Sequence, residues 1–144
     1  MTHRRELLTA AFGLAAAAGA AGPAAAQANP AGGGHMSLAE CIAICLKCHA
    51  TCQDAVGKTL SGPGRAEPAL VMTLLDCAEI CQATANSMSR GSPVHTAFCG
   101  ACAEVCDACA EACGKARTAA ALQPCVDLCR ECAMSCRHMA GSMH

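Results

Sequence analysis

The sequence predicts an all-α protein, an antiparallel up-down-up-down four-helix bundle with a cysteine-lined core. Its fifteen cysteines fall into four runs, in which they recur at the steps of three and four residues that mark one face of a helix. Clusters of glycine, proline and serine separate the runs. Connections this short favour antiparallel packing of consecutive helices. The 10 basic and 11 acidic residues nearly cancel, which suggests no nucleic-acid partner.

Residues 1–28 are expected to be a signal peptide. Arg4 and Arg5 precede an alanine-rich apolar stretch, and Ala26–Ala28 has the small-x-small form of a cleavage site. The paired arginines favour the twin-arginine (Tat) route, which would place the mature protein in the periplasm. The alternative is a single membrane anchor, but the stretch is short, is interrupted by glycines and ends at Pro23. We therefore expect no membrane span in the mature form.

The mature chain is predicted to begin with a flexible leader, residues 29–35, because it contains a proline and three consecutive glycines. The bundle itself is predicted to occupy residues 36–144. Ser37 and Glu40 have the spacing of a capping box, which marks the start of the first helix. This helix is expected to run to about Gly57.

The second helix is expected over residues 67–89, since Pro68 suits a first helical turn. Gly91 suits the position just beyond the end of that helix. Ser92 would then cap the third helix and Pro93 would be its first residue.

The third helix is expected to end at about Gly114. Residues 115–123 would connect it to the fourth helix, whose first turn would contain Pro124. Gly141 is the expected end of the fourth helix.

Thiols occupy the core positions that would hold leucine and isoleucine in an ordinary bundle. Apolar neighbours such as Ile42, Ile80 and Leu128 would widen the buried face or form contacts between bundles, whereas His49 lies off the stripe and is expected on a flank. The candidate ligands on the four stripes are Cys41, Cys45, Cys48, Cys52, Cys77, Cys81, Cys99, Cys102, Cys106, Cys109, Cys113, Cys125, Cys129, Cys132 and Cys136.

Two explanations of the thiols need no metal. Cysteine packs as a small hydrophobe, yet thiols in place of leucine-sized side chains would leave a thinly filled and destabilised core. A disulfide framework is common in exported proteins. Against it, the odd count leaves one thiol over, and neighbours on one helical stripe have poor geometry for a bridge. Bridges between helices are not excluded by this argument.

Metal binding is the third explanation, because soft thiolates select Cu(I), Zn(II) or iron–sulfur clusters. The spacing differs from the familiar cluster motifs, and one or two zinc sites would suffice to hold a bundle together. Fifteen bare thiolates would each carry a large cost of burial, and no row of lysine or arginine lies on the stripes to offset them. Multiple Cu(I) ions, about one per thiolate, would make the core nearly neutral.

One end of the bundle carries further candidate ligands. The stripes continue to Met88 on the second helix, His95 on the third and Met139 on the fourth, and His35 and Met36 precede the first helix at the same end. Thioether and imidazole groups bind copper and stay neutral. This end is therefore the predicted mouth through which copper passes. Alternatively, the methionines simply fill the bundle end and His95 is solvated.

Together these patterns resemble the four-helix-bundle copper storage proteins. The resemblance rests on the export signal, the CxxxCxxCxxxC runs at 41–52 and 125–136, the longer run at 99–113 and the sparser Cys77/Cys81 helix. It implies a homotetramer of bundles that stores Cu(I) outside the cytoplasm, in some members for copper-requiring acceptor proteins. It also implies that the fifteen cysteines are core ligands and that Met88, His95 and Met139 form a cluster at the open end.

Other functions are distinguishable in principle. An oxidoreductase would need one low-pKa cysteine at a helix N-terminus with a resolving partner, which the regular stripes do not offer, so we expect no enzyme. A copper chaperone or detoxification protein is one alternative, and a zinc- or disulfide-stabilised structural bundle is another. A high Cu(I) stoichiometry would separate storage from a chaperone and from a structural bundle.

Overall fold

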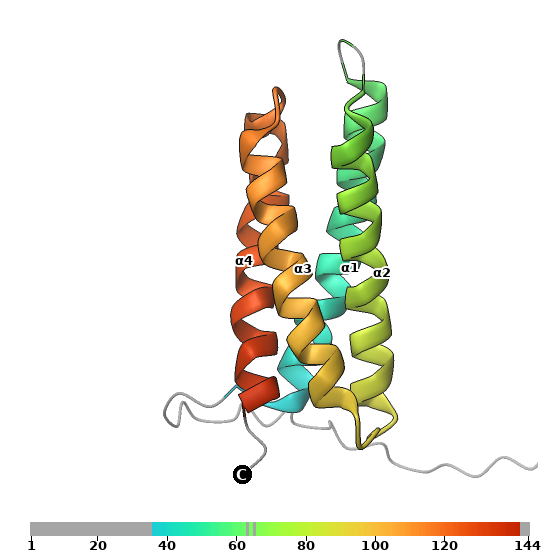
Figure 1. The fold of residues 1–144 in the computed structure, drawn as a ribbon, viewed down its shortest axis with the longest axis vertical. Coiled ribbons are helices and arrows are strands. Elements are labelled where there is room, and N and C mark those ends of the chain that lie inside the picture. The colour runs from blue at the N-terminus through green and yellow to red at the C-terminus, as the bar shows by residue number, and fades with distance from the viewer. Residues whose placement is uncertain (1–35, 63, 65, 142–144) are drawn as a thin grey trace, which may run out of the picture. The chain divides into compact units, whose positions relative to one another are not determined.

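The computed structural model describes residues 36–62, 64 and 66–141, and these residues form four helices and no strand. The predicted signal peptide and leader, including the candidate ligand His35, lie outside the described residues. In chain order the helices are α1 (Leu38–Ser61), α2 (Pro68–Ser89), α3 (His95–Lys115) and α4 (Ala119–Gly141). Both α1 and α3 pack against α2 and α4 (Figure 1). The predicted up-down-up-down bundle is confirmed.

The start of α1 is fixed by the predicted capping box. The Ser37 Oγ accepts a hydrogen bond from the Glu40 amide at 3.2 Å, and the Ser37 amide donates to the Glu40 carboxylate at 2.7 Å. The predicted end at Gly57 is wrong, because the helix continues to Ser61. Thr59 extends the buried stripe beyond that glycine, and its hydroxyl bonds to the carbonyl of Ala55 at 2.8 Å. Burial of the stripe outweighs the low helix propensity of one glycine.

The turn between α2 and α3 has the predicted glycine in a left-handed conformation, with φ of 63° at Gly91. The Gly91 amide donates to the Met88 carbonyl at 2.9 Å, and the Ser92 amide donates to the Ser87 carbonyl at 3.1 Å. This pair of bonds is the Schellman motif, which closes the end of a helix.

The predicted start of the third helix at Pro93 is wrong by two residues. The His95 amide donates to the Ser92 carbonyl at 3.1 Å, which closes a tight turn around Pro93 and Val94. Regular α3 hydrogen bonding begins only after this turn, at His95. The predicted helix end at Gly114 differs from the observed end, Lys115, by one residue.

The start of α4 is the largest departure from the sequence prediction. The helix begins at Ala119, so most of the predicted connection at 115–123 is helical and Pro124 lies inside the helix. Alanine and leucine are strong helix formers, and Leu122, only 1% exposed, continues the buried stripe by one step. The carbonyl of Ala120 loses its helical partner because proline has no N–H.

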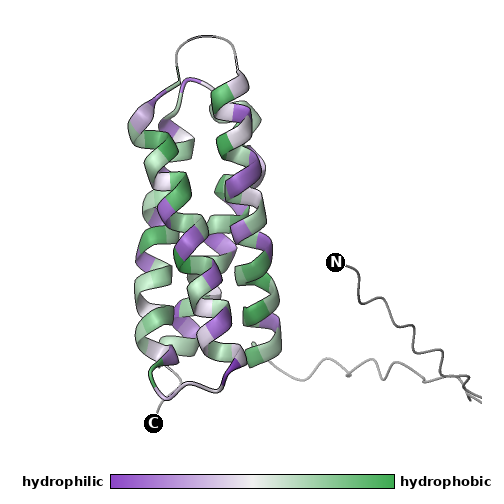
Figure 2. Ribbon diagram, turned by 90° about the vertical axis from the view of Figure 1, so that its right-hand side faces the viewer, coloured by the Kyte–Doolittle hydropathy of each residue, from purple (hydrophilic) through white to green (hydrophobic). Residues whose placement is uncertain are grey.

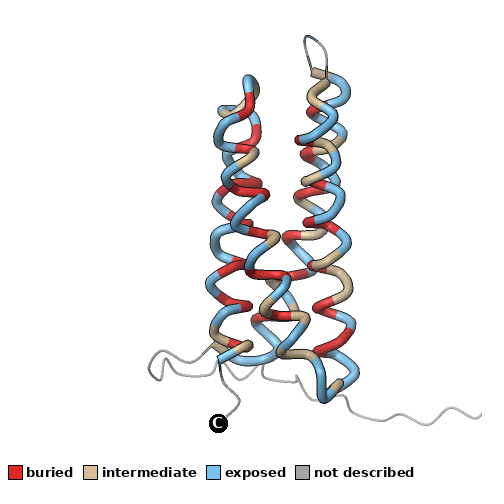
Figure 3. Tube along the Cα trace, in the orientation of Figure 1, coloured by how far each residue is buried: buried red, intermediate tan, exposed pale blue. Residues whose placement is uncertain are grey.

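The core runs along the bundle axis and is lined by the inward face of every helix (Figure 3). Polar and apolar residues alternate along the helices, as Figure 2 shows. At the end of the bundle near the α2–α3 turn the core is closed by Met88 and Met139, which we call the methionine end. At the other end it is closed by Leu70, Leu74 and Leu122, which we call the leucine end.

Outside the cysteine core, neighbouring helices pack through apolar side chains and a few polar contacts. Leu128 is buried, whereas Ile42 and Ile80 are partly buried against the core. His49, expected on a flank, lies half-buried between α1 and α2, with its Nδ1 2.8 Å from the carbonyl of Ala78. No helix among the described residues has both the length and the apolar character needed to cross a membrane.

Candidate metal centre

The fifteen predicted cysteines all lie in the core. Fourteen of them have no exposed surface, and Cys125 is only 2% exposed. Each is a free thiol. The buried polar side chains among the described residues are hydroxyls, Thr59, Thr84, Ser87 and Ser135, so no buried ammonium, guanidinium or carboxylate accompanies the thiols. We call the fifteen Sγ atoms the sulfur array.

The sulfurs of the array meet mainly between α1 and α4 and between α2 and α3. Between α1 and α4, Cys45 lies 3.6 Å from Cys136 and Cys48 lies 3.7 Å from Cys129. Between α2 and α3, Cys81 lies 3.5 Å from Cys106. These separations are well beyond the disulfide bond length of about 2.05 Å. Contacts across the diagonal from α2 to α4 close the array in the middle of the bundle, for example Cys81 to Cys132 at 3.9 Å.

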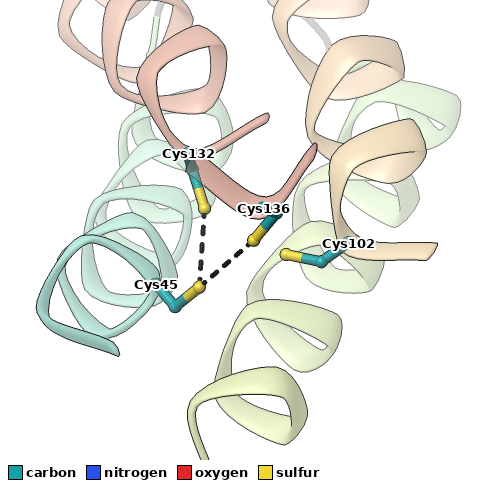
Figure 4. Close-up of side chains that lie close together, drawn as sticks. All are labelled: Cys45, Cys102, Cys132 and Cys136. Carbon is teal, nitrogen blue, oxygen red and sulfur yellow. Dashed lines mark hydrogen bonds between the residues drawn. The ribbon is translucent and has the colours of Figure 1, made fainter. Parts of the chain in front are cut away.

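Twelve of the cysteines belong to sets of four whose sulfurs all lie within 4.8 Å of one another. Figure 4 shows one such set, formed by Cys45, Cys102, Cys132 and Cys136, with the Cys45 sulfur facing those of Cys132 and Cys136. Neighbouring sets share members, so the array is continuous along the axis. The five sets are Cys45/Cys102/Cys132/Cys136, Cys81/Cys102/Cys106/Cys132, Cys48/Cys77/Cys81/Cys106, Cys48/Cys52/Cys77/Cys129 and Cys52/Cys109/Cys125/Cys129.

The spacing of the sulfurs suits thiolate-bound metal ions. With a metal–sulfur bond of about 2.3 Å, the value for zinc, two sulfurs on opposite sides of an ion lie about 4.6 Å apart and two sulfurs at a tetrahedral ion lie somewhat closer. The observed separations of 3.5–4.0 Å and the 4.8 Å limit of the sets cover this range. Shared members allow one sulfur to bridge two ions.

Hydrogen bonds between the thiols shift their pKa values in opposite directions. Bonds from Cys106 and Cys129 hold the pKa of Cys48 well below its ordinary value. Bonds to Cys102 and Cys106 raise the pKa of Cys81 well above it. A thiolate that accepts hydrogen bonds is stabilised, whereas a thiol that donates keeps its proton. Neighbouring sulfurs thus share protons, and a soft monovalent cation can take the place of each.

The methionine end joins the array through sulfur. The thiol of Cys99 donates to the Met88 Sδ at 3.8 Å, and Met88 is 2% exposed. Met139 is 8% exposed and closes the same end from α4. His95 is half-buried, and its Nδ1 lies 2.8 Å from the carbonyl of Ser92. A histidine that donates from Nδ1 to a carbonyl presents Nε2 to a metal ion.

Ser135 is a polar neighbour of the array that the sequence analysis missed. The residue is 1% exposed, and its hydroxyl donates to the Met36 Sδ. Its neighbour Cys41 has a pKa that is lowered by bonds from Cys136 first and then from Cys45. Ser135 precedes Cys136 and lies beside the stripe, not on it, so the step of three and four residues passes over it. Met72 and Met134 lie on the surface and are 59% and 63% exposed.

Comparison with known proteins gives one family and several structures. A family model described as copper storage protein matches residues 34–141. No curated protein matches the chain. A solved structure from Nitrosospira multiformis is 38% identical, with 74% of this chain and 96% of that chain covered and a TM-score of 0.68.

Two further structures contain copper according to their descriptions. The Cu(I)-bound copper storage protein 3 of Bacillus subtilis is 31% identical over 73% of this chain and 100% of that chain, with a TM-score of 0.68. A cytosolic copper storage protein from Streptomyces lividans, loaded with five coppers, is 33% identical over 74% of this chain and 94% of that chain, with a TM-score of 0.69.

Proposed function

Because this chain belongs to the copper storage protein family, we propose that it stores copper by binding many Cu(I) ions along its sulfur array. The observation that carries the proposal is the array itself, fifteen buried free thiols with no buried charged side chain beside them in the part of the chain that the structure describes. The solved relatives described as Cu(I)-bound and as loaded with five coppers support the identity of the ion and its multiplicity. The fifteen cysteines are the proposed core ligands.

Charge favours a monovalent ion over zinc. A zinc ion bound by four thiolates leaves a site with two excess negative charges, and among residues 36–62, 64 and 66–141 the core offers no cation to compensate them. One Cu(I) per thiolate, with sulfurs shared between ions, is neutral. Neutrality is decisive here because an unpaired buried charge costs several kcal/mol even after relaxation.

Copper is proposed to pass through the methionine end. Met88 contacts Cys99 of the array, and the Nδ1 contact of His95 leaves Nε2 as its metal-binding nitrogen. With Met139 these two residues supply neutral, copper-capable groups at the end of the array. Neutral ligands attract Cu(I) less strongly than thiolates do, so an ion bound at this end is more easily passed on. We assign the protein no catalytic activity.

We further propose that residues 1–28 direct export to the periplasm by the twin-arginine route, that residues 29–35 form a leader and that the bundle follows. Folding before export would keep the thiols in a reducing compartment. A reporter fused to Met1–Ala28 tests the route, because changing Arg4 and Arg5 to lysine should abolish its export. Unchanged export would exclude the twin-arginine proposal.

A homotetramer of bundles is proposed as the storage form. Support comes from the apolar side chains that remain exposed on α1 and α2, among them Leu38, Leu46 and Leu75, each 42–43% exposed. Exposed apolar groups on neighbouring helices are typical of contacts between proteins. A copper-requiring acceptor protein is the proposed destination of the metal.

An anaerobic Cu(I) titration of the reduced protein against a chromogenic chelator tests the function, with thiols counted in the same samples. We expect tight binding of about one ion per cysteine, as charge neutrality requires. Saturation at one or two ions would reject storage and would instead favour a chaperone. Fewer than fifteen titratable thiols in protein that has not been reduced would indicate disulfides.

A further inference from the structure

A small surface crevice, with a volume of about 30 Å³, lies between α1 and α4, toward the leucine end of the bundle. From α1 it is lined by Asp54 and Lys58, and from α4 by Ala121, Pro124 and Cys125. Asp54 and Lys58 form an ion pair at 2.6 Å, and both are more than half exposed. The crevice therefore has a polar, solvent-exposed rim and reaches a member of the sulfur array.

Cys125 also differs from the other cysteines in its exposure to solvent. As a residue it is buried but keeps 2% of its surface exposed, whereas the other fourteen cysteines are 0% exposed. Its sulfur is nevertheless well inside the array, 3.7 Å from Cys52, 3.8 Å from Cys129 and 4.0 Å from Cys113. A ligand that reaches Cys125 from the side thus has direct access to the array.

This access point is remote from the methionine end. Cys125 and Cys136 are three turns apart on α4, which corresponds to about 16 Å at a rise of 1.5 Å per residue. Beyond Cys125 the axis of the bundle is closed by Leu70, Leu74 and Leu122, all at most 5% exposed. An ion held near Cys125 would have to pass the whole array to leave by the methionine end, and the crevice is the shorter route.

The wall of the crevice includes the first turn of α4, which contains Ala121 and is followed by Pro124. Pro124 cannot donate a backbone hydrogen bond to Ala120, so the first turn, which carries Ala121, lacks one helical bond. Helix ends with missing bonds open locally at low free-energy cost. Such opening would widen the crevice above Cys125 without unfolding the bundle.

We propose that this crevice is a second copper exchange site, at which a small thiol compound exchanges Cu(I) directly with Cys125. The inference rests on the proposed storage function. In the exchange toward the compound, its sulfur binds the ion as the Cys125 sulfur leaves, and the proton lost by the incoming thiol passes to Cys125. Copper stays in the +1 state throughout, so no oxidant or reductant takes part.

Access is tested first without copper, by timed alkylation of the reduced protein with iodoacetamide and mass spectrometry of its peptides. We expect Cys125 to react several-fold faster than its array neighbours Cys52 and Cys109. Ala121→Trp should slow the reaction of Cys125 several-fold by filling the crevice. The matched control is Ala120→Trp, an exposed alanine on the same turn that does not line the crevice. Equal rates at Cys125 in the two variants would overturn the proposal.

Exchange is tested on copper-loaded protein, with glutathione as the small thiol and a chromogenic chelator as the final acceptor. Ala121→Trp should slow the release of a fraction of the copper several-fold, whereas Ala120→Trp should release copper as the unmodified protein does. If the protein loads many ions but both variants release them alike, the second site is rejected and storage stands. If the protein fails to load many ions, the storage function itself is rejected.

Discussion

The Sγ atoms of Cys81 on α2 and Cys106 on α3 lie 3.5 Å apart, and both residues belong to the same two sets of four sulfurs. Cys81 also reaches across the bundle to Cys132 on α4 at 3.9 Å. Cys113 stands in contrast, because it belongs to none of the five sets and has Cys125, at 4.0 Å, as its partner. Cys81 is therefore a junction of the array, and Cys113 is at its edge.

This difference predicts unequal effects of two matched substitutions. Cys81→Ala and Cys113→Ala should each lower the Cu(I) capacity by about one ion, since each removes one thiolate that would balance an ion. Cys81→Ala should also weaken the affinity for the remaining ions, because it interrupts the sharing of sulfurs between sets. Competition with a chromogenic chelator measures both quantities. Equal affinities in the two variants would contradict a continuous array.

Met88→Leu should slow loading and leave capacity unchanged. The swap preserves volume in the core and costs less than about 1.5 kcal/mol of stability, but it removes the thioether that contacts Cys99. Stopped-flow loading under anaerobic conditions measures the rate. Met134→Leu, at a site 63% exposed, is the control and should load at the normal rate. Normal loading of Met88→Leu would remove Met88 from the path of copper.

Copper loading should release protons and weaken as the pH falls. Bonds with neighbouring thiols raise the pKa of Cys81 and Cys129, so these groups hold their protons at neutral pH and must lose them to bind Cu(I). Cys48 and Cys109 have lowered pKa values and lose theirs more readily.

The cysteines with lowered pKa values should bind copper first. Because these cysteines hold fewer protons at neutral pH, the first ions bound should release fewer protons than the last. For each proton released, affinity should change about tenfold per pH unit. Titration of weakly buffered protein with a pH indicator measures the release. Uniform release from the first ion to the last would show that the hydrogen bonds between thiols do not set the order of loading.

His49→Ala should destabilise the bundle without changing its copper capacity. The substitution removes the hydrogen bond to the Ala78 carbonyl that links α1 to α2, with an expected loss of about 1 kcal/mol in the free energy of unfolding. Denaturation of the reduced, copper-free protein measures this loss. Gln53→Ala is the control, because Gln53 contacts the outer ring nitrogen of His49 at 3.3 Å and is exposed. A drop in capacity would instead indicate a ligand role for His49.

Much of the bundle could be predicted because the step of three and four residues is itself the signature of its core. The same step that identifies the core cysteines also leads to Met88, and the structure places the Met88 sulfur in contact with Cys99. Helix boundaries were less predictable where proline was read as a start. Pro124 lies inside α4 because Leu122 gains burial ahead of it, and burial depends on the other helices, not on local sequence.

The cysteine spacing also could not predict the contacts of residues that lie beside the stripe. Ser135 and His49 each lie one position from a cysteine, on the side that faces a neighbouring helix. Which flank of a helix meets a neighbour depends on how the helices are arranged around the axis. The crevice at Cys125 is likewise a property of two helices that are distant in sequence.

The sulfur contacts between helices have a consequence for the time at which the array can form during synthesis. The contacts between helices described above join a cysteine of α1 or α2 to a cysteine of α3 or α4. The exception is the contact of Cys113 with Cys125, which joins α3 to α4. A growing chain that has completed only α1 and α2 holds six cysteines but completes none of the five sets, because each set includes a sulfur from α3 or α4. Four of the five sets include a sulfur of α4, so we expect most of the capacity for copper to arise only when the last helix is complete.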